Sequence, residues 1–313
     1  MGSSRWYKGL RGASTLIAAS VFATGVVSPA WAARPGGGGG SSNPPSGNDV
    51  SYPQCGSSLP SSPAFAIVGV NGGLANDLNS CFGPSGTYPY YIQSELYWAT
   101  SSATGATAQP KVGLYVNTAD PGNSYNGTPI ADWPTTSSGS DPYGSCSTTT
   151  LVTSSGTFTV GANSQACAWQ YGYNMASQDM TWLVDAANAI NAQETKFPVS
   201  SDATQYTWWL DVETANSWQS GSSGQLMNAA DLRGMHDAID SAPIATSVGI
   251  YSTSSQWSSI TGGQFPLSLP DWIPGARTES GAISNCSLAA FSGGPVAITQ
   301  WTSHSLDSDY ACG

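Results

Sequence analysis

A pair of carboxylates directly after an apolar segment is the feature of this sequence best suited to chemistry. Asp211 and Glu213 follow Trp208 and Leu210, and one residue, Val212, separates them. In a β-strand, residues i and i+2 point to the same face, so both carboxylates would share a face with Trp209. Their mutual repulsion would raise the pKa of one, as a general acid near neutral pH requires. The pattern favours glycoside hydrolysis, although the same residues could simply end a strand and cap a loop.

Further acidic residues lie near both ends of the predicted folded part. Asp49 ends a first predicted strand, and it is either a third carboxylate of the same site or a turn residue. Spacing alone slightly favours the turn. Asp307 and Asp309, close to the C-terminus, leave the same two interpretations open.

Aromatic side chains are abundant, and several fall on or beside predicted strand ends. Sugars present apolar C–H faces, so a carboxylate site lined with Trp and Tyr would suit a saccharide. Buried aromatic residues are more often core than ligand platform, so abundance alone does not decide their role. The residues at strand ends are Tyr115, Trp209, Tyr251, Trp257, Trp272 and Trp301, of which Tyr251, Trp272 and Trp301 are the preferred site candidates.

Other catalytic patterns lack their parts in this sequence. It contains no G-x-S-x-G nucleophile elbow and no P-loop. The chain has 2 His residues, His236 in a predicted helix and His304 in a polar loop, too few to suggest a zinc site. We therefore expect no metal and no cofactor.

The elements that must position these residues alternate between strands and helices. About eight strands in one domain is the pattern of a (β/α)8 TIM-type barrel, and an open doubly wound sheet fits almost as well. Helical periodicity is clearest over 176–193 and 229–241. The predicted strands are 49–51, 65–70, 112–117, 207–212, 248–252, 271–274, 297–301 and 309–312.

The first 46 residues have the composition of an export signal and a tether. Basic residues precede an apolar run that ends in Ala30-Trp31-Ala32, which predicts a signal peptide over 1–32. A Gly/Ser/Pro-rich linker follows over 33–46, and the barrel domain occupies 47–313. We expect a secreted monomer with no membrane insertion after signal removal.

Charge excludes one class of partner. Three of the eight basic residues precede the predicted cleavage site, so the mature chain keeps five against 19 acidic residues, a formal charge of −14. Such a chain would be repelled by a phosphate backbone, and we expect no nucleic-acid partner.

Six cysteines in an exported chain predict three disulfides. Pairing in chain order is preferred because it closes loops of modest length: Cys55–Cys81, Cys146–Cys167 and Cys286–Cys312. Residues 120–167 are rich in Ser, Thr, Gly and Pro, which predicts a disulfide-bonded insertion on a barrel loop, with a hairpin near 149–160.

The order of the chemistry-bearing segments resembles glycoside hydrolase family 25, the lysozymes (N-acetylmuramidases) that cut bacterial peptidoglycan. The segments are Asp49-Val50-Ser51, Phe65-Ala66-Ile67-Val68, Val112-Gly113-Leu114-Tyr115, Leu210-Asp211-Val212-Glu213, Val248-Gly249-Ile250-Tyr251-Ser252, Asp271-Trp272-Ile273 and Thr299-Gln300-Trp301-Thr302. The strings GNDVSYPQCG and WWLDVETANSW are more specifically similar to a secreted actinobacterial branch. The resemblance covers most of 47–313 and leaves the insertion unmatched.

The resemblance implies roles for individual residues. It makes Glu213 the proton donor, Asp211 the group that orients or stabilises the acetamido group of the substrate, and Asp49 a third site carboxylate. It places the late acidic residue of the family at Asp309 or Asp307, puts Tyr251 and Gln300 in the pocket, and implies a retaining outcome.

The chain departs from the family after Asp-Val-Ser, where it has Tyr52-Pro53-Gln54-Cys55, and in its disulfides and insertion. The hypothesis is therefore a glycosidase of β-linked amino-sugar glycan, with peptidoglycan as substrate. A glycan-binding barrel without turnover and a purely structural secreted protein are the alternatives. Asp309, Tyr251, Trp272, Gln300 and Trp209 are the predicted substrate-binding residues.

Overall fold

Eight strands close into a barrel in a computed structural model that describes residues 45–72, 75–138, 140–193, 196–241, 247–303 and 306–312. The predicted signal peptide and the linker up to residue 44 lie outside the described residues, and strand β1 already begins at Ser46. Among the described helices, none is long and apolar enough to cross a membrane.

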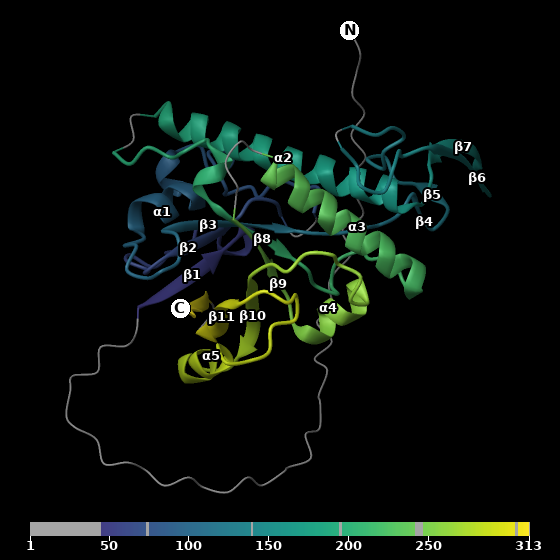
Figure 1. Ribbon diagram of the computed structural model, residues 1–313. Helices are drawn as coiled ribbons and strands as arrows, with labels where there is room; N and C mark the ends of the chain where they lie inside the picture. The colour runs from purple at the N-terminus through teal and green to yellow at the C-terminus, as the bar shows by residue number, and fades with distance from the viewer. Residues whose placement is uncertain are drawn as a thin grey trace, which may run out of the picture. The chain divides into compact units, whose positions relative to one another are not determined.

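The barrel strands are those that the hydrophobic pattern predicts. Their order around the barrel is β1, β2, β3, β8, β9, β10, β11 and β12, and β12 closes onto β1 (Figure 1). Closure excludes the open doubly wound alternative and confirms the predicted barrel. The bounds are β1 Ser46–Val50, β2 Ala66–Gly69, β3 Val112–Asn117, β8 Thr207–Asp211, β9 Ser247–Tyr251, β10 Asp271–Ala276, β11 Val296–Ser303 and β12 Leu306–Ala311.

One strand departs from the all-parallel arrangement of a regular (β/α)8 barrel. Neighbouring strands from β1 to β11 are parallel, whereas β12 is antiparallel to both β11 and β1. The physical reason is the length of the last connection: β11 ends at Ser303 and β12 begins at Leu306. A parallel return needs a crossover of a dozen or more residues. The start of β12 therefore lies at the same end of the barrel as the carboxyl ends of the other strands.

Helices cover the outside of the barrel between the strands. Outward-facing residues such as Val68, Leu114 and Leu210 are fully buried in the core between sheet and helices. The helices are α1 Glu95–Ser102, α2 Gln165–Asn191, α3 Gly221–Asp240, α4 Ser254–Thr261 and α5 Glu279–Asn285, with 3₁₀ turns η1 Tyr52–Gln54, η2 Tyr91–Gln93 and η3 Ala203–Gln205.

Helices α2 and α3 both begin earlier than periodicity predicted, at 165 instead of 176 and at 221 instead of 229. Their first turns carry Gly, Ser and aromatic residues, and the close contact of the two helices stabilises them there. A Cβ added at Gly172 would lie 2.0 Å from the carbonyl oxygen of Asp231, and one at Gly234 would lie 1.9 Å from that of Trp169. Only glycine permits this approach of the two backbones.

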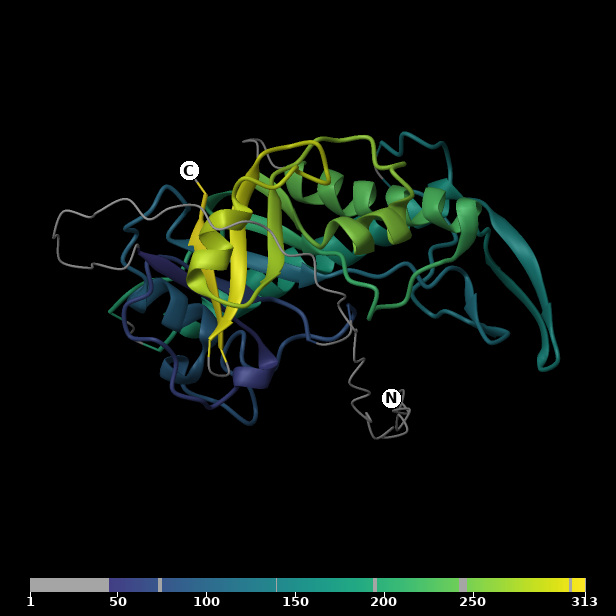
Figure 2. The same cartoon turned by 90° about the horizontal axis from the view of Figure 1, so that it is seen from below.

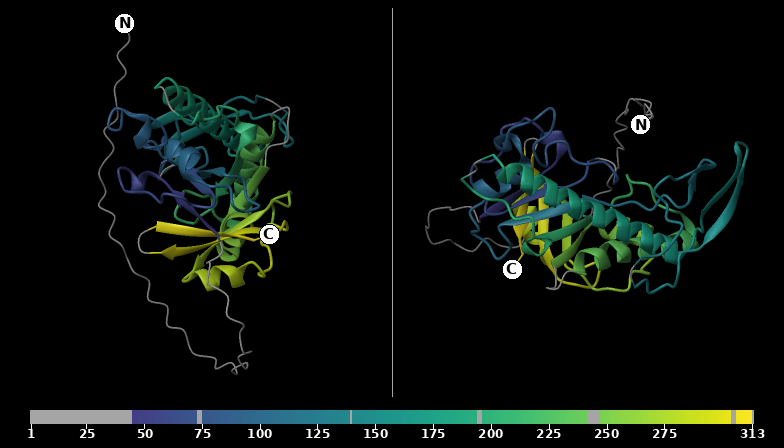
Figure 3. Two further views of the ribbon diagram at one scale, coloured as in Figure 1. Left: turned by 90° about the vertical axis from the view of Figure 1, so that its left-hand side faces the viewer. Right: turned by 90° about the horizontal axis from the view of Figure 1, so that it is seen from above.

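The insertion lies between β3 and α2. It contains two small antiparallel pairs, β4 Ser124–Tyr125 with β5 Thr128–Pro129, and β6 Thr148–Thr153 with β7 Gly156–Gly161. The second pair is the predicted hairpin, and it projects away from the barrel (Figures 2 and 3). The Cys146–Cys167 disulfide ties the insertion to the first turn of α2.

All three predicted disulfides are present, Cys55–Cys81, Cys146–Cys167 and Cys286–Cys312. The barrel interior is a separate apolar layer that includes Phe65, Ile67, Trp209, Trp272 and Ile298. This layer fills the barrel and forms the base of the site at its carboxyl end.

Candidate active site

A cavity of about 250 Å³ opens at the carboxyl ends of the barrel strands. This is the end at which enzymes of this architecture hold their catalytic residues. Among the described residues that line it, none is Lys, Arg or His, and four are acidic. The lining residues are Asp49, Ser51, Tyr52, Pro53, Gln54, Tyr115, Asn117, Asp211, Glu213, Tyr251, Trp272, Gln300 and Asp307.

Asp211 is the last residue of β8, and its backbone is fixed from the neighbouring strand. The hydroxyl of Thr118 donates to the carbonyl oxygen of Asp211 over 2.6 Å. The carboxylate is buried, and its Oδ1 has no hydrogen-bond partner in the described part of the chain. Burial raises its pKa well above the usual value, with further contributions from the charges of Glu213 and Asp49. Burial therefore favours the protonated form of Asp211.

Glu213 lies two residues after the end of β8, and its side chain is half-buried at the cavity wall. Its backbone carbonyl accepts a hydrogen bond from Trp218 Nε1 over 2.8 Å, which anchors the loop. Burial raises the pKa of the Glu213 carboxyl and the charge of Asp307 adds to this, while a hydrogen bond to Gln256 opposes it. A raised pKa together with access to the cavity suits a proton donor.

Asp49 lies on β1 and is held by a chain of hydrogen bonds from β9 and β11. Tyr251 Oη donates to Gln300 Oε1 over 3.0 Å, and Gln300 Nε2 donates to Asp49 Oδ2 over 2.9 Å. Although Asp49 keeps some exposure to the cavity, it lies deep in the protein. This burial and the charge of Asp307 raise its pKa to about 7.

Asp307 and Asp309 lie two positions apart on β12, so their side chains point to the same face at different depths in the barrel. Asp307 lines the cavity, and Asp309 lies two residues deeper, fully buried. Trp272 Nε1 donates to Asp309 Oδ1 over 3.0 Å, whereas Oδ2 has no hydrogen-bond partner in the described part of the chain. Burial raises the pKa of Asp309 well above the usual value, the charges of Asp49 and Asp307 add to this, and the hydrogen bond from Trp272 opposes it.

Aromatic rings form the base and wall of the cavity. Trp272 lies edge-on to Tyr251, with centroids 4.7 Å apart, and to Trp209 and Tyr115 at 5.7 and 6.3 Å. Of the predicted binding residues, Tyr251, Trp272 and Gln300 line the cavity, whereas Trp209 lies beneath it in the interior layer. Trp301 is also buried and is not among the lining residues.

Sequence reasoning missed two groups of lining residues. The first is Ser51 to Gln54, in the turn after β1, and the second is Asn117 at the end of β3, next to Tyr115, which was named as a strand-end aromatic residue but not as a preferred site candidate. Alternation along a strand contains the signal for both, because Ser51 follows Asp49 by two positions and Asn117 follows Tyr115 likewise.

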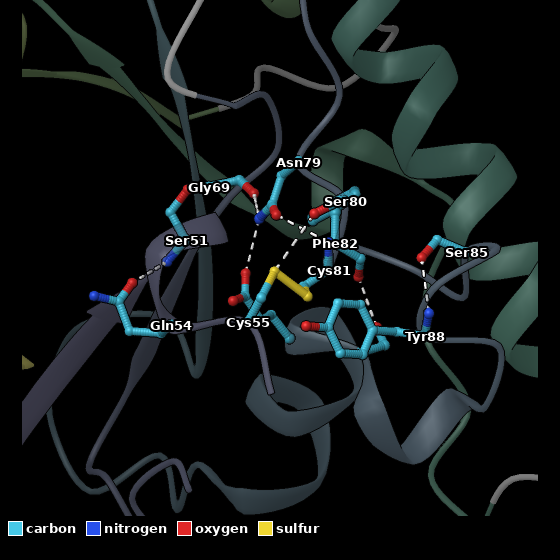
Figure 4. The surroundings of a disulfide bond; sticks show 12 residues. Ser51, Gln54, Cys55, Gly69, Asn79, Ser80, Cys81, Phe82, Ser85 and Tyr88 are labelled. Carbon is cyan, nitrogen blue, oxygen red and sulfur yellow. Dashed lines mark hydrogen bonds between the residues drawn. A yellow bond between two sulfur atoms is a disulfide. The ribbon is translucent and has the colours of Figure 1, made fainter. Parts of the chain in front are cut away.

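The turn after β1 is held in place by the first disulfide (Figure 4). Cys55 pairs with Cys81, and Asn79 Nδ2 donates to the carbonyl oxygen of Gly69 on β2 over 2.8 Å. A Cβ at Gly69 would lie 2.6 Å from Ser51 Oγ and 2.8 Å from the Tyr115 ring. The absence of a side chain at this position lets Ser51 and Tyr115 meet at the cavity wall.

Metal binding finds little support in the described part of the chain. Its one group of His, Cys, Asp or Glu atoms at suitable spacing is Cys55, Cys81 and Glu95. The two sulfur atoms of that group form a disulfide and are not available as thiolate ligands. His236 contacts Asp237 on α3 and lies outside the cavity, and His304 lies outside the described residues.

Comparisons with known proteins give one similar structure. No protein-family model and no curated protein matches the sequence. Among solved structures, the chain is similar to the bacterial lysozyme from Streptomyces coelicolor, at 12% identity and a TM-score of 0.40, over 87% of this chain and 94% of that one. The function of the protein is therefore inferred from the geometry of its own cavity.

Proposed function

We propose that the protein is a secreted glycoside hydrolase that cleaves β-linked amino-sugar glycan, with bacterial peptidoglycan as its substrate. The observation that carries the proposal is the cavity itself, in which four carboxyl groups and four aromatic rings meet without a basic residue among the described lining residues. An ionised carboxylate in such a site favours developing positive charge, as in the oxocarbenium-like transition state of glycoside hydrolysis. On this proposal the chain belongs to glycoside hydrolase family 25, in the secreted actinobacterial branch, and three disulfides support export.

The carboxyl groups take different roles because their surroundings differ. Glu213, half-buried at the wall with a raised pKa, donates its proton to the glycosidic oxygen as the C1–O bond breaks. Asp49, fixed by Gln300, stabilises the positive charge that develops on the sugar ring. Asp211 orients the acetamido group. Water then adds to C1 from the face that the leaving group vacated and gives a proton to Glu213, so the anomeric configuration is retained.

The direct test adds purified residues 33–313 to bacterial cell walls and follows turbidity and released reducing ends. Glu213→Gln is expected to lower release by at least about a hundredfold, because general acid catalysis contributes roughly that much. Asp185→Asn, an exposed carboxylate on α2, is the matched control and is expected to retain full activity.

Three other outcomes would each contradict a different part of the proposal. The departure from the family at Tyr52-Pro53-Gln54-Cys55 favours a glycan-binding protein without turnover as the second candidate. Wall binding without release of reducing ends would select that candidate. Neither binding nor release would leave a structural role, and full release by Glu213→Gln would show that the proton donor is another residue.

A further inference from the structure

Two additional cavities lie beyond the catalytic one, on the side of the insertion. The first, here called the insertion cavity, has a volume of about 220 Å³ and is lined by residues that include Ala119, Ile130, Tyr171 and Ala215. The second, the helix cavity, has about 400 Å³ and lies against α2, where it is lined by Asn174, Gln178 and Trp182 among others. Ala75, Asn76 and Asp132 line both, so the two cavities adjoin.

The insertion cavity and the catalytic cavity are lined by nearby residues of the same loops. Asn117 and Glu213 line the catalytic cavity, and Ala119 and Ala215, each two residues further along the same loops, line the insertion cavity. The two loops run side by side: Thr118 hydroxyl bonds the carbonyl of Asp211, and Asp120 N bonds that of Ser217 over 2.9 Å.

The loop after β2 follows the same course. Asn71 Nδ2 donates to the carbonyl oxygens of Asn117 and Ala75, over 3.0 and 3.1 Å, and thereby joins the wall of the catalytic cavity to a residue that lines both outer cavities. Loops from three adjacent strands thus connect the wall of the catalytic cavity to Ala75, which lines the helix cavity together with Trp182 of α2.

The lining chemistry of the helix cavity matches a neutral chain of sugars. Trp182 is partly exposed and is accompanied by the side-chain amides of Asn76, Asn174 and Gln178. An indole offers a flat apolar surface to a sugar ring, and amides bond its hydroxyl and acetamido groups in either direction. Asp132 is the one charged residue among the described lining residues, so the cavity disfavours anionic ligands.

We propose that the insertion and helix cavities are subsites for further sugar units of the glycan strand that is cut at Glu213. The inference depends on the proposed function and specifies its substrate as a polymer several sugar units long. It also gives residues 120–167 a role, because Ile130 and Asp132 of that segment line the insertion cavity. Without the insertion, this cavity would lack one wall.

The test uses the full mature chain with Glu213→Gln, which permits binding to be measured without turnover. Isothermal titration calorimetry compares chitobiose, chitotetraose and chitohexaose as amino-sugar probes of increasing length. We expect affinity to rise with length, and Trp182→Ala to lower chitohexaose affinity by roughly tenfold, the contribution of one stacked ring. Val184→Ala, exposed on the same helix and absent from the cavity lining, is the matched control.

Truncation of Trp182 also removes packing against the core, so two further variants are needed. Gln178 and Asp132 have exposed side chains, and Gln178→Ala and Asp132→Ala serve this purpose. Smaller losses of chitohexaose affinity in both would support the inference. A length-dependent affinity that survives all three substitutions would overturn the inference and leave the proposed function intact. No binding of any chitooligosaccharide or of cell-wall glycan would overturn the proposed function and this inference together.

Discussion

Gln300 on β11 hydrogen-bonds Asp49 on β1 over 2.9 Å, across the intervening antiparallel strand β12. The orientation of its amide is set from the other side, where Tyr251 Oη donates to Gln300 Oε1. With Oε1 occupied as acceptor, only the Nε2 donor remains to face Asp49. The catalytic cavity is therefore preorganised by a hydrogen-bond chain that crosses from β9 to β1.

Gln300→Ala should shift the pH dependence of activity. The amide hydrogen bond favours the ionised form of Asp49, whose pKa is about 7, so its removal raises that pKa further. Asp49 must be ionised to stabilise positive charge, and the rising limb of kcat/KM against pH is expected to move to higher pH. Cell-wall turnover measured between about pH 5 and pH 9 gives this limb.

Gln264→Ala, an exposed amide after α4, is the control for loss of a glutamine and should leave the limb where it is. A limb that stays in place in Gln300→Ala would show that Asp49 is not the group whose ionisation it reports. Tyr251→Phe frees the amide to turn and should give a smaller shift in the same direction.

Trp272→Phe should destabilise the barrel by leaving Asp309 short of a partner. Its indole is the donor to Asp309 Oδ1, and Oδ2 of the same carboxyl has no partner within the residues that the structure describes. Loss of a partner of a buried polar group costs about 1–3 kcal/mol. Trp209→Phe removes a similar volume from the same layer and serves as the control for packing. In urea unfolding, Trp272→Phe should lose more free energy of unfolding than Trp209→Phe, by about this amount. Equal losses in the two variants would assign the effect to packing alone.

Much of this architecture could be predicted from local patterns. The strands are short apolar segments with alternation, and each falls within a few residues of its predicted place. Asp211 and Glu213 share a cavity because strand geometry requires it, whereas Asp49 came from family resemblance, since spacing alone favoured a turn. Chain-order pairing of the cysteines followed from loop length.

What the sequence could not supply depends on contacts between distant segments. The direction of β12 decides that Asp307 lines the cavity and Asp309 lies beneath it, and nothing local to either residue distinguishes them. The early start of α2 depends on Gly172 meeting α3, a contact 59 positions away in sequence at Asp231. The positions of the two outer cavities beside the catalytic cavity likewise depend on which loops run side by side.

Removal of the Cys146–Cys167 disulfide should weaken binding of long glycans. The bond ties the insertion to α2, and Asp132 of the insertion faces Trp182 of α2 across the helix cavity. Cys146→Ser with Cys167→Ser is expected to lower the chitohexaose affinity of the Glu213→Gln chain to the level of Trp182→Ala. The expected loss of stability is about 3 kcal/mol, from the loop of 21 residues that the bond closes.

The equivalent change at Cys286–Cys312, which joins α5 to the end of β12, is the control. It should cost similar stability without a specific loss of chitohexaose affinity relative to chitobiose. A selective loss of long-chain binding in this control variant would contradict the assignment of the outer subsites to the insertion.

Stability should increase as pH falls from about 8 towards 5, opposite to the usual acid denaturation. Burial raises the pKa of Asp49 and Glu95 to about 7 and that of Asp120 to about 6, and it raises those of Asp179 and Asp231 well above the usual value. A carboxyl with a raised folded-state pKa binds its proton more tightly in the folded than in the unfolded chain. The stability it contributes is complete below the unfolded pKa and is lost as pH rises through the folded one.

Asp179→Asn isolates one member of this group. Asp179 on α2 is buried with neither carboxylate oxygen hydrogen-bonded in the described structure, and burial is the single cause of its raised pKa. The amide cannot ionise, so the variant should be more stable than the parent near pH 8, and its free energy of unfolding should fall less steeply with pH, by up to about 1.4 kcal/mol per pH unit. Urea unfolding at several pH values measures both effects, with Asp185→Asn on the same helix as the control for charge. A parent protein that becomes more stable as pH rises through this window would contradict the burial of these carboxyl groups.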